Sequence, residues 1–168
     1  MGKMPAALGV AILGVAGLVV PAQAADEPIT FPKMYGSGRG GTINLPGTGG
    51  KCLDAALEEI DRDGGKVQMW TCGLAGAEQQ WRYEYVGDSS GQAYVVNEAN
   101  GKCLDIALEE IGQEGGRVQM WQCTGSVEQR FTVVYHQGDL FITPVATKGF
   151  LGASGVHEGA PIGIYAKG

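Results

Sequence analysis

The chain of 168 residues repeats its own sequence at an offset of 51 positions. Three segments recur: GKCLD at 50–54 and 101–105, ALEEI at 56–60 and 107–111, and VQMW at 67–70 and 118–121. Such self-similarity indicates an architecture built from copies of one supersecondary unit. Apolar residues alternate over short runs, as Val67 and Met69 do, and glycine pairs separate the runs. Each copy is therefore predicted to form about four short strands.

A third, degenerate copy follows the other two. GFLGA at 149–153 stands where the KCLD motif is expected, and IGIY at 162–165 stands where VQMW is expected. Three such copies predict a small closed barrel with threefold symmetry, which is an all-β fold. The first ALEEI segment favours a loop between strands that rests Leu57 and Ile60 on the core, with one helical turn as the alternative.

The N-terminus has the pattern of a secretory signal peptide. Lys3 precedes an apolar run at 6–20, and AQA at 22–24 is an A-x-A cleavage site. A transmembrane anchor is the alternative, but the run is short and acidic residues follow it. We therefore predict that 1–24 are removed and that 25–168 form a single secreted, extracellular domain without membrane insertion.

The mature chain divides into an N-terminal segment and three copies: 25–41, 42–92, 93–138 and 139–168. The third copy ends before its fourth strand. We predict that 29–35 supply this twelfth strand and pair near 162–165, so that the N-terminal strand completes the third repeat and leaves no long open edge. Pro28 and Pro32 each remove a backbone donor, and a flexible leader is the alternative.

The charge balance excludes several classes of function. With 12 Lys and Arg against 18 Asp and Glu, the formal net charge is −6, whereas nucleic-acid binding needs a surplus of basic residues on one face. His136 and His157 are the only histidines and lie far from every cysteine, so a histidine-based metal site or acyl-transfer triad is not expected. We predict no catalytic residue, no metal, no cofactor and no nucleic-acid partner.

The chain has 4 cysteines, and an even number in an exported protein indicates disulfides. Neighbouring side chains of a strand point to opposite faces, so Cys52 and Cys72 lie on the same side if Leu53 faces the core. The repeat makes the pairs Cys52–Cys72 and Cys103–Cys123 local and equivalent, and we predict these two bridges. Zinc binding is not expected, because the closely spaced C-x2-C pairs are missing.

The same alternation gathers an aspartate, a glutamine and a tryptophan on the outward surface of each of the first two copies: Asp54, Gln68 and Trp70, and Asp105, Gln119 and Trp121. An aromatic ring can cover the apolar C–H face of a sugar while a carboxylate accepts bonds from adjacent hydroxyls. The alternative is structural: the tryptophans cover the side of the barrel, and the aspartates bind turn amides. Because the set occurs twice, we favour a pocket.

Together these motifs resemble the ricin B-type lectin family, the (QxW)3 β-trefoils. KCLD, VQMW-x-C and QQW at 79–81 carry the resemblance in the first copy, and QRF at 129–131 replaces the last motif in the second. The resemblance extends over 50–134 and implies an all-β β-trefoil of three four-stranded repeats, with Trp81 and Phe131 in the core. It implies a carbohydrate partner, a galactose-type sugar or a polysaccharide, bound by two sets of residues: Asp54, Gln68, Trp70 and Gln79, and Asp105, Gln119, Trp121 and Gln129.

The sequence departs from the family pattern at three points. Glu78 and Glu128, which belong to the two predicted sites, stand where the family usually has Asn, so a carboxylate lies close to Asp54 or Asp105. Two nearby carboxylates repel each other, which raises one pKa or requires a cation. In the third copy Gly152 and Gly163 replace the aspartate and the glutamine, so neither a pocket nor a disulfide is expected there.

These observations predict a secreted, non-catalytic carbohydrate-binding protein, a monomer with up to two shallow sugar sites. The alternative is a β-trefoil that has lost sugar binding and acts as a protein-interaction or inhibitor module through its acidic loops, at Glu58 and Glu59 and at Glu109 and Glu110. An enzyme with Glu58 and Glu59 as paired acids is disfavoured, because adjacent exposed acids at a turn are ordinarily solvated.

Overall fold

The structure is a computed structural model that describes residues 27–73, 76–87 and 89–166, so the predicted signal peptide lies outside the described residues. Thirteen strands form one sheet: β1 (Ile29–Thr30), β2 (Met34–Tyr35), β3 (Asn44–Leu45), β4 (Lys51–Ala55), β5 (Gly65–Thr71), β6 (Trp81–Tyr85), β7 (Gln92–Asn97), β8 (Cys103–Ile106), β9 (Gly116–Trp121), β10 (Arg130–His136), β11 (Asp139–Pro144), β12 (Phe150–Ala153) and β13 (Ile162–Tyr165). Within these ranges the only helical elements are four 3₁₀ turns: η1 (Leu57–Glu59), η2 (Ala77–Gln79), η3 (Leu108–Glu110) and η4 (Val127–Gln129). No helix of the described part is long and apolar enough to cross a membrane.

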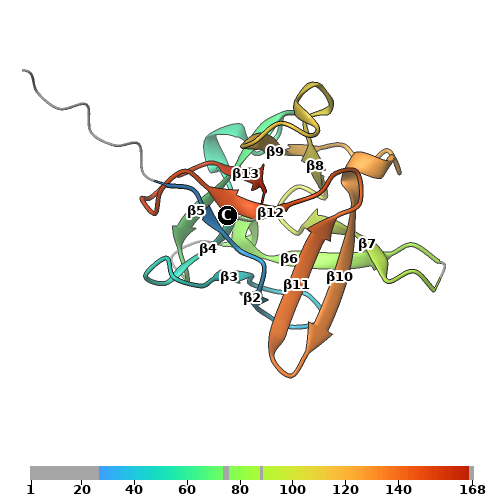
Figure 1. Ribbon diagram of the computed structural model, residues 1–168, viewed down its shortest axis with the longest axis horizontal. Helices are drawn as coiled ribbons and strands as arrows, with labels where there is room; N and C mark the ends of the chain where they lie inside the picture. The colour runs from blue at the N-terminus through green and yellow to red at the C-terminus, as the bar shows by residue number, and fades with distance from the viewer. Residues whose placement is uncertain (1–26, 74–75, 88, 167–168) are drawn as a thin grey trace, which may run out of the picture.

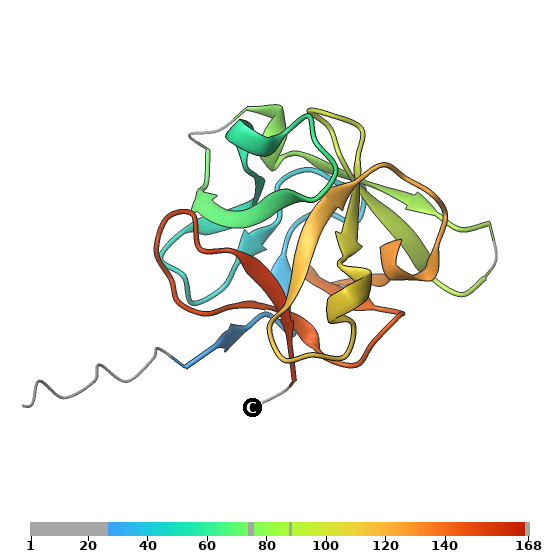
Figure 2. The ribbon, with the colours of Figure 1, turned by 90° about the horizontal axis from the view of Figure 1, so that it is seen from above.

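The strands form a closed barrel and three equivalent hairpins (Figures 1 and 2). In the barrel, β6 pairs with β7, β7 with β10, β10 with β11, β11 with β2 and β2 with β3, and a bridge between Gly41 and Trp81 returns to β6. The hairpins are β4–β5, β8–β9 and β12–β13, one from each repeat, and β9 pairs with both β5 and β13. Because the ring closes, no long barrel edge is left open.

The core contains one large aromatic side chain from each repeat. Trp81 and Phe131, which the resemblance places in the core, are both buried, and the Trp81 Nε1 donates a 3.0 Å hydrogen bond to the Leu53 carbonyl. Phe31 occupies the equivalent position of the third repeat and is completely buried. The prediction from sequence missed Phe31 as the third member of this set, although it lies 50 residues before Trp81, as Trp81 does before Phe131.

The N-terminal segment completes the third repeat, but with different partners from those predicted. β1 pairs with β12, with Ile29 opposite Ala153 and Thr30 opposite Gly152, and β2 pairs with β11 and β3. The expected pairing near Ile162–Tyr165 is wrong, because β13 already has β12 on one side and β9 on the other. The segment therefore attaches to the free edge of β12 and then enters the barrel.

The ALEEI segments form 3₁₀ turns rather than plain loops, and the expected role of Leu57 is wrong. Leu57 is 62% exposed and its counterpart Leu108 is 66% exposed, whereas Ile60 and Ile111 pack against the core. The leucines lie instead at the rims of two surface pockets.

The two predicted disulfides are confirmed. Cys52 is bonded to Cys72 and Cys103 to Cys123, with a Cα–Cα distance of 5.1 Å in each. The equal geometry follows from the repeat, since each bridge joins the first strand of a hairpin to a cysteine one or two residues after the end of the second strand. Bridges of this size stabilise a small domain mainly by restricting the unfolded chain.

Candidate functional site

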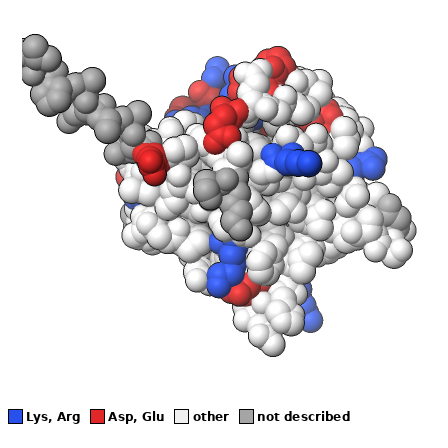
Figure 3. Space-filling view, in the orientation of Figure 1, with Lys and Arg blue, Asp and Glu red and all other residues white. Residues whose placement is uncertain are grey.

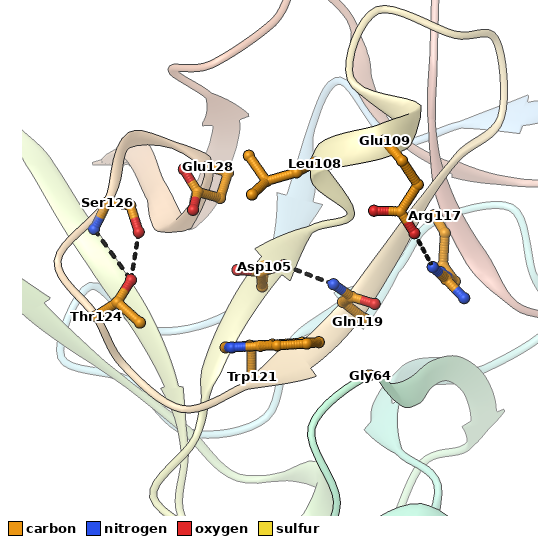
Figure 4. A pocket seen from close by; sticks show the side chains of 10 residues that line it. All are labelled: Gly64, Asp105, Leu108, Glu109, Arg117, Gln119, Trp121, Thr124, Ser126 and Glu128. Carbon is orange, nitrogen blue, oxygen red and sulfur yellow. Dashed lines mark hydrogen bonds and ion pairs between the residues drawn. The ribbon is translucent and has the colours of Figure 1, made fainter.

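A pocket lies beside the hairpin of each of the first two repeats. The repeat-1 pocket has a volume of about 230 Å³ and contains Asp54, Gln68, Trp70 and Glu78 in its lining. The repeat-2 pocket, shown in Figure 4, has a volume of about 370 Å³ and contains the equivalent Asp105, Gln119, Trp121 and Glu128. The two pockets thus bring together side chains from the first strand, the second strand and the following turn of each repeat.

The floor of each pocket is a buried aspartate held by two glutamines. Asp54 on β4 lies directly opposite Gln68 on β5, and the Gln68 Nε2 donates to the Asp54 Oδ1 at 2.8 Å. Gln79, from η2, donates through its Nε2 to the Asp54 Oδ2 at 3.2 Å. The second repeat reproduces both bonds, from Gln119 and Gln129 to the two oxygens of Asp105, at 2.8 and 3.0 Å. Each carboxylate is therefore fixed in orientation before any ligand arrives.

Burial raises the pKa of both aspartates above the ordinary value for a carboxyl group. The glutamine bonds act in the opposite direction, while the charges of Glu78 and Glu58 add to the increase at Asp54. Glu128 and Glu109 have the same effect on Asp105. A carboxylate that is partly desolvated in this way gains more from a ligand that donates hydrogen bonds than an exposed one does.

An exposed tryptophan forms one wall of each pocket. Trp70 is 38% exposed and Trp121 is 39% exposed, in contrast to the buried Trp81. In Figure 4 the ring of Trp121 is seen edge-on, with one face turned towards the space in front of Asp105. The strand alternation explains this orientation. Successive side chains of β5 point to opposite faces, so Trp70 faces outward while Met69 points into the core.

Glu78 and Glu128 occupy the turns η2 and η4 and are both buried, with 8% of their surface exposed. The Glu78 Oε1 accepts a 2.9 Å bond from the Gly76 backbone N–H. Glu128 lines the repeat-2 pocket, and Figure 4 shows its carboxylate on the side of Asp105 and Leu108. Each pocket therefore contains a second buried acid beside its aspartate.

In the described part of the third repeat, Gly152 stands at the position of the aspartate, and the N-terminal strand occupies part of the corresponding space. A side chain at Gly152 would place its Cβ 2.5 Å from the Ile29 carbonyl oxygen and 2.7 Å from the Tyr165 ring. A depression of about 220 Å³ does lie beside Tyr165 and Arg117, so the expectation of no pocket there is wrong. Its described lining lacks the aspartate and the glutamine, because glycines replace them.

The aromatic residues Trp70, Trp121 and Tyr165 are each covered at one edge by a loop of the neighbouring repeat. The prediction from sequence missed these contacts. Three acids accept backbone N–H bonds across the repeat boundaries: Asp63 from Gln122 at 2.9 Å, Glu114 from Ala166 at 2.9 Å and Glu158 from Thr71 at 3.0 Å. The glycine after each acid lies against the aromatic ring: Gly64 on Trp121, Gly115 on Tyr165 and Gly159 on Trp70. The recurring acid-glycine pairs at 63–64, 114–115 and 158–159 were the available signal.

The glycines of these loops have left-handed backbone conformations, with φ of +80° at Gly64 and +75° at Gly159. Such values are costly for residues with a Cβ atom, and glycine also allows the backbone to approach the ring closely. Lys102 forms a 2.6 Å ion pair with Asp63, and Lys51 forms a 2.8 Å ion pair with Glu158. The repeat-1 pocket therefore depends on a loop of repeat 3, and the repeat-2 pocket on a loop of repeat 1.

Comparison with known proteins identifies a family and a fold. Residues 35–131 match the model of the ricin-type beta-trefoil lectin domain. The designed threefold-symmetric protein ThreeFoil is 24% identical, with a TM-score of 0.60 over 70% of this chain and 83% of that one. The Polyporus squamosus lectin, solved with a bound sialylated trisaccharide epitope, is 16% identical, with a TM-score of 0.60 over 81% of this chain and 44% of that one.

The fold is also similar to part of a larger enzyme. An exo-β-1,3-galactanase from Clostridium thermocellum is 22% identical, with a TM-score of 0.65 over 77% of this chain, but this chain spans only 27% of the enzyme. A comparison with curated protein sequences finds no significant match. The structural matches and the family model confirm the predicted all-β trefoil fold.

Proposed function

The chain belongs to the ricin-type β-trefoil lectin family, and we propose that it is a non-catalytic carbohydrate-binding protein with two shallow sugar sites, one in each of its first two repeats. Membership of the family supports carbohydrate binding. The number of sites and the residues that form them are our proposal. A single shallow site of this kind binds weakly, with a Kd of about 0.1 to 1 mM, and two sites on one polysaccharide increase the avidity.

The observation that carries the proposal is the repeated geometry of an exposed tryptophan above a buried, oriented aspartate. The indole face suits the apolar C–H face of a pyranose ring, and the aspartate retains lone pairs for two adjacent hydroxyls. Gln68 and Gln119 each hold one oxygen of their aspartate, which fixes where those hydroxyls must lie. Packing alone would not require the same polar arrangement twice under a solvent-exposed ring.

The acidic loops give less support to a protein-interaction module, because basic side chains already pair with them. Glu59 forms a 2.7 Å ion pair with Arg62, and Glu109 forms a 2.7 Å ion pair with Arg117. Figure 3 shows the same mixture, with basic side chains close to acidic ones on the visible face.

The same loop gives little support to catalysis. The Arg62 bond holds the pKa of Glu59 below its usual range, which is unsuitable for a general acid.

We further propose that the protein is secreted and acts outside the cell as a monomer. The two disulfides are consistent with an extracellular protein, since such bonds persist in oxidising compartments. The predicted signal peptide supports the same location.

The experiment for this proposal is a glycan array probed with the mature protein and with the double variant Asp54→Ala plus Asp105→Ala. We expect the unmodified protein to bind a subset of glycans and the double variant to lose that binding. Asp61→Ala, at an exposed loop position, is the control and should bind normally. An unmodified protein that is folded and binds no glycan would overturn the proposal.

The loop contacts between repeats predict that each pocket can be weakened from outside. In a Trp121→Ala background, where only the repeat-1 pocket should report, Glu158→Gln should weaken sugar binding by about fivefold, the effect of one charge-assisted hydrogen bond. Among the described residues, Asp63 contacts only the repeat-2 pocket region, so Asp63→Asn in the same background should leave the affinity unchanged. Calorimetric titration compares the two, and equal losses would contradict the assignment of loops to pockets.

A further inference from the structure

Both pockets contain more negative than positive charge. The repeat-2 pocket is lined by Asp105, Glu109 and Glu128 against the single guanidinium of Arg117. The repeat-1 pocket reproduces this imbalance, with three acids against one lysine: Asp54, Glu58 and Glu78 against Lys66. A neutral sugar would leave this excess uncompensated, so the charge itself carries information about the ligand.

The positive charge in each pocket is already bound to the outer acid. The Arg117 guanidinium lies 2.7 Å from Glu109 and 3.6 Å from Glu110, and the Lys66 ammonium lies 3.9 Å from Glu58. These pairs are at the exposed rim, as Figure 4 shows for Arg117 and Glu109. The inner acids are Asp54 and Glu78 in the repeat-1 pocket and Asp105 and Glu128 in the repeat-2 pocket. They receive no ion pair from a described residue.

The inner acids also receive no hydrogen bond from a charged donor among the described residues. Among the described residues, Asp105 accepts bonds only from the neutral amides of Gln119 and Gln129, which do not compensate its charge. Glu128 is 8% exposed, lines the pocket, and receives no hydrogen bond or ion pair from any residue that the structure describes, whereas Glu78 accepts one bond, from the Gly76 backbone N–H. The charge of Glu128 contributes to the raised pKa of Asp105, which places the two carboxylates within electrostatic reach of each other.

A partly desolvated carboxylate without a cationic partner gains from a ligand that brings a positive charge. No group of three or more His, Cys, Asp or Glu side chains in the described ranges could hold a metal ion, so an organic cation fits better than a metal. The tryptophan beside the two acids favours both the C–H face of a sugar ring and a positive charge held above its own ring. A sugar that carries an ammonium group meets all of these requirements.

We infer that the two pockets select amino sugars, with the protonated amine between the inner aspartate and the inner glutamate of each pocket. This inference rests on the proposed sugar-binding function and specifies its substrate class. Asp54 with Glu78, and Asp105 with Glu128, supply the selectivity, while Trp70 and Trp121 supply the surface on which the ring rests. A charge-assisted bond from the ammonium replaces the donor that Glu128 lacks.

The test compares two oligosaccharides of equal length that differ only at the amine: glucosamine oligomers and their fully N-acetylated counterparts. At mildly acidic pH, where alkyl amines are protonated, calorimetry should give at least about tenfold tighter binding to the free amine. Glu78→Gln plus Glu128→Gln should reduce the affinity for the amine to that for the acetylated form. Glu84→Gln plus Glu98→Gln removes the same charge outside the pockets and should preserve the preference.

Three results would overturn the inference. The acetylated oligomer could bind as tightly as the amine, the preference could survive in the Glu78 and Glu128 double variant, or neutral sugars could require added calcium for binding. In each of these cases sugar binding itself would stand and only the selectivity would fail. Absence of binding to every glycan, by contrast, would contradict the proposed function.

Discussion

Replacement of Trp81 by alanine should lower the free energy of unfolding by about 3–5 kcal/mol, because it removes a completely enclosed aromatic side chain from the barrel. The variant also leaves the Leu53 carbonyl without its 3.0 Å bond from the indole N–H. Trp70→Ala is the matched control. Its ring is 38% exposed, so the loss should be much smaller.

Denaturant unfolding followed by circular dichroism measures both variants against the unmodified chain. The comparison separates the two roles of tryptophan in the repeats, one in packing and one at the pocket. Equal destabilisation by the two substitutions would contradict the orientation of the exposed rings.

Removal of residues 27–35 should unfold or aggregate the protein, because it opens the barrel between β11 and β3. The same segment carries Phe31 and Met34, both completely buried. The milder variant Phe31→Ala should cost about 3–5 kcal/mol of unfolding free energy. Tyr35→Ala, at a 45% exposed position of the same segment, should cost far less.

Thermal unfolding and size-exclusion chromatography report on these variants together. A truncated protein with an unchanged unfolding midpoint would show that the barrel closes without its N-terminal strands. Similar losses in Phe31→Ala and Tyr35→Ala would show that Phe31 is not the third core aromatic residue.

The hairpins and disulfides could be predicted because the repeat encodes them locally. Leu53 opposite Met69 and Asp54 opposite Gln68 are consequences of alternation over a few residues, and the second copy confirms the register. The disulfide pairing followed from the same alternation. Features of this kind depend on residues close together in the sequence and little on the rest of the chain.

The path of the N-terminal segment could not be predicted to the same degree. Pro28 and Pro32 flank β1 and limit it to two residues, so no strand pattern was present to define its register. The partner of β1 depends on which edge of the third hairpin is free, and that is decided by β9, far away in the sequence. Phe31 was overlooked because its copy lacks the preceding glutamine of the QxW motif.

In the candidate site, the aspartate, glutamine and tryptophan of each pocket were predicted from alternation and come together in the structure. Leu57 was placed wrongly, because an apolar residue was assumed to be buried, whereas it lines the repeat-1 pocket. The loops that cover Trp70 and Trp121 involve contacts between repeats. Periodicity within one repeat contains no information about these contacts.

The proposed function requires two sugar sites on each chain. Calorimetric titration of the folded, mature protein with an oligosaccharide that it binds should give two sites for the unmodified chain, one for Trp70→Ala, one for Trp121→Ala and none for the double variant. All four proteins should unfold at nearly the same midpoint, because both rings are exposed. Two remaining sites in the double variant, or no binding by the unmodified protein, would contradict the account.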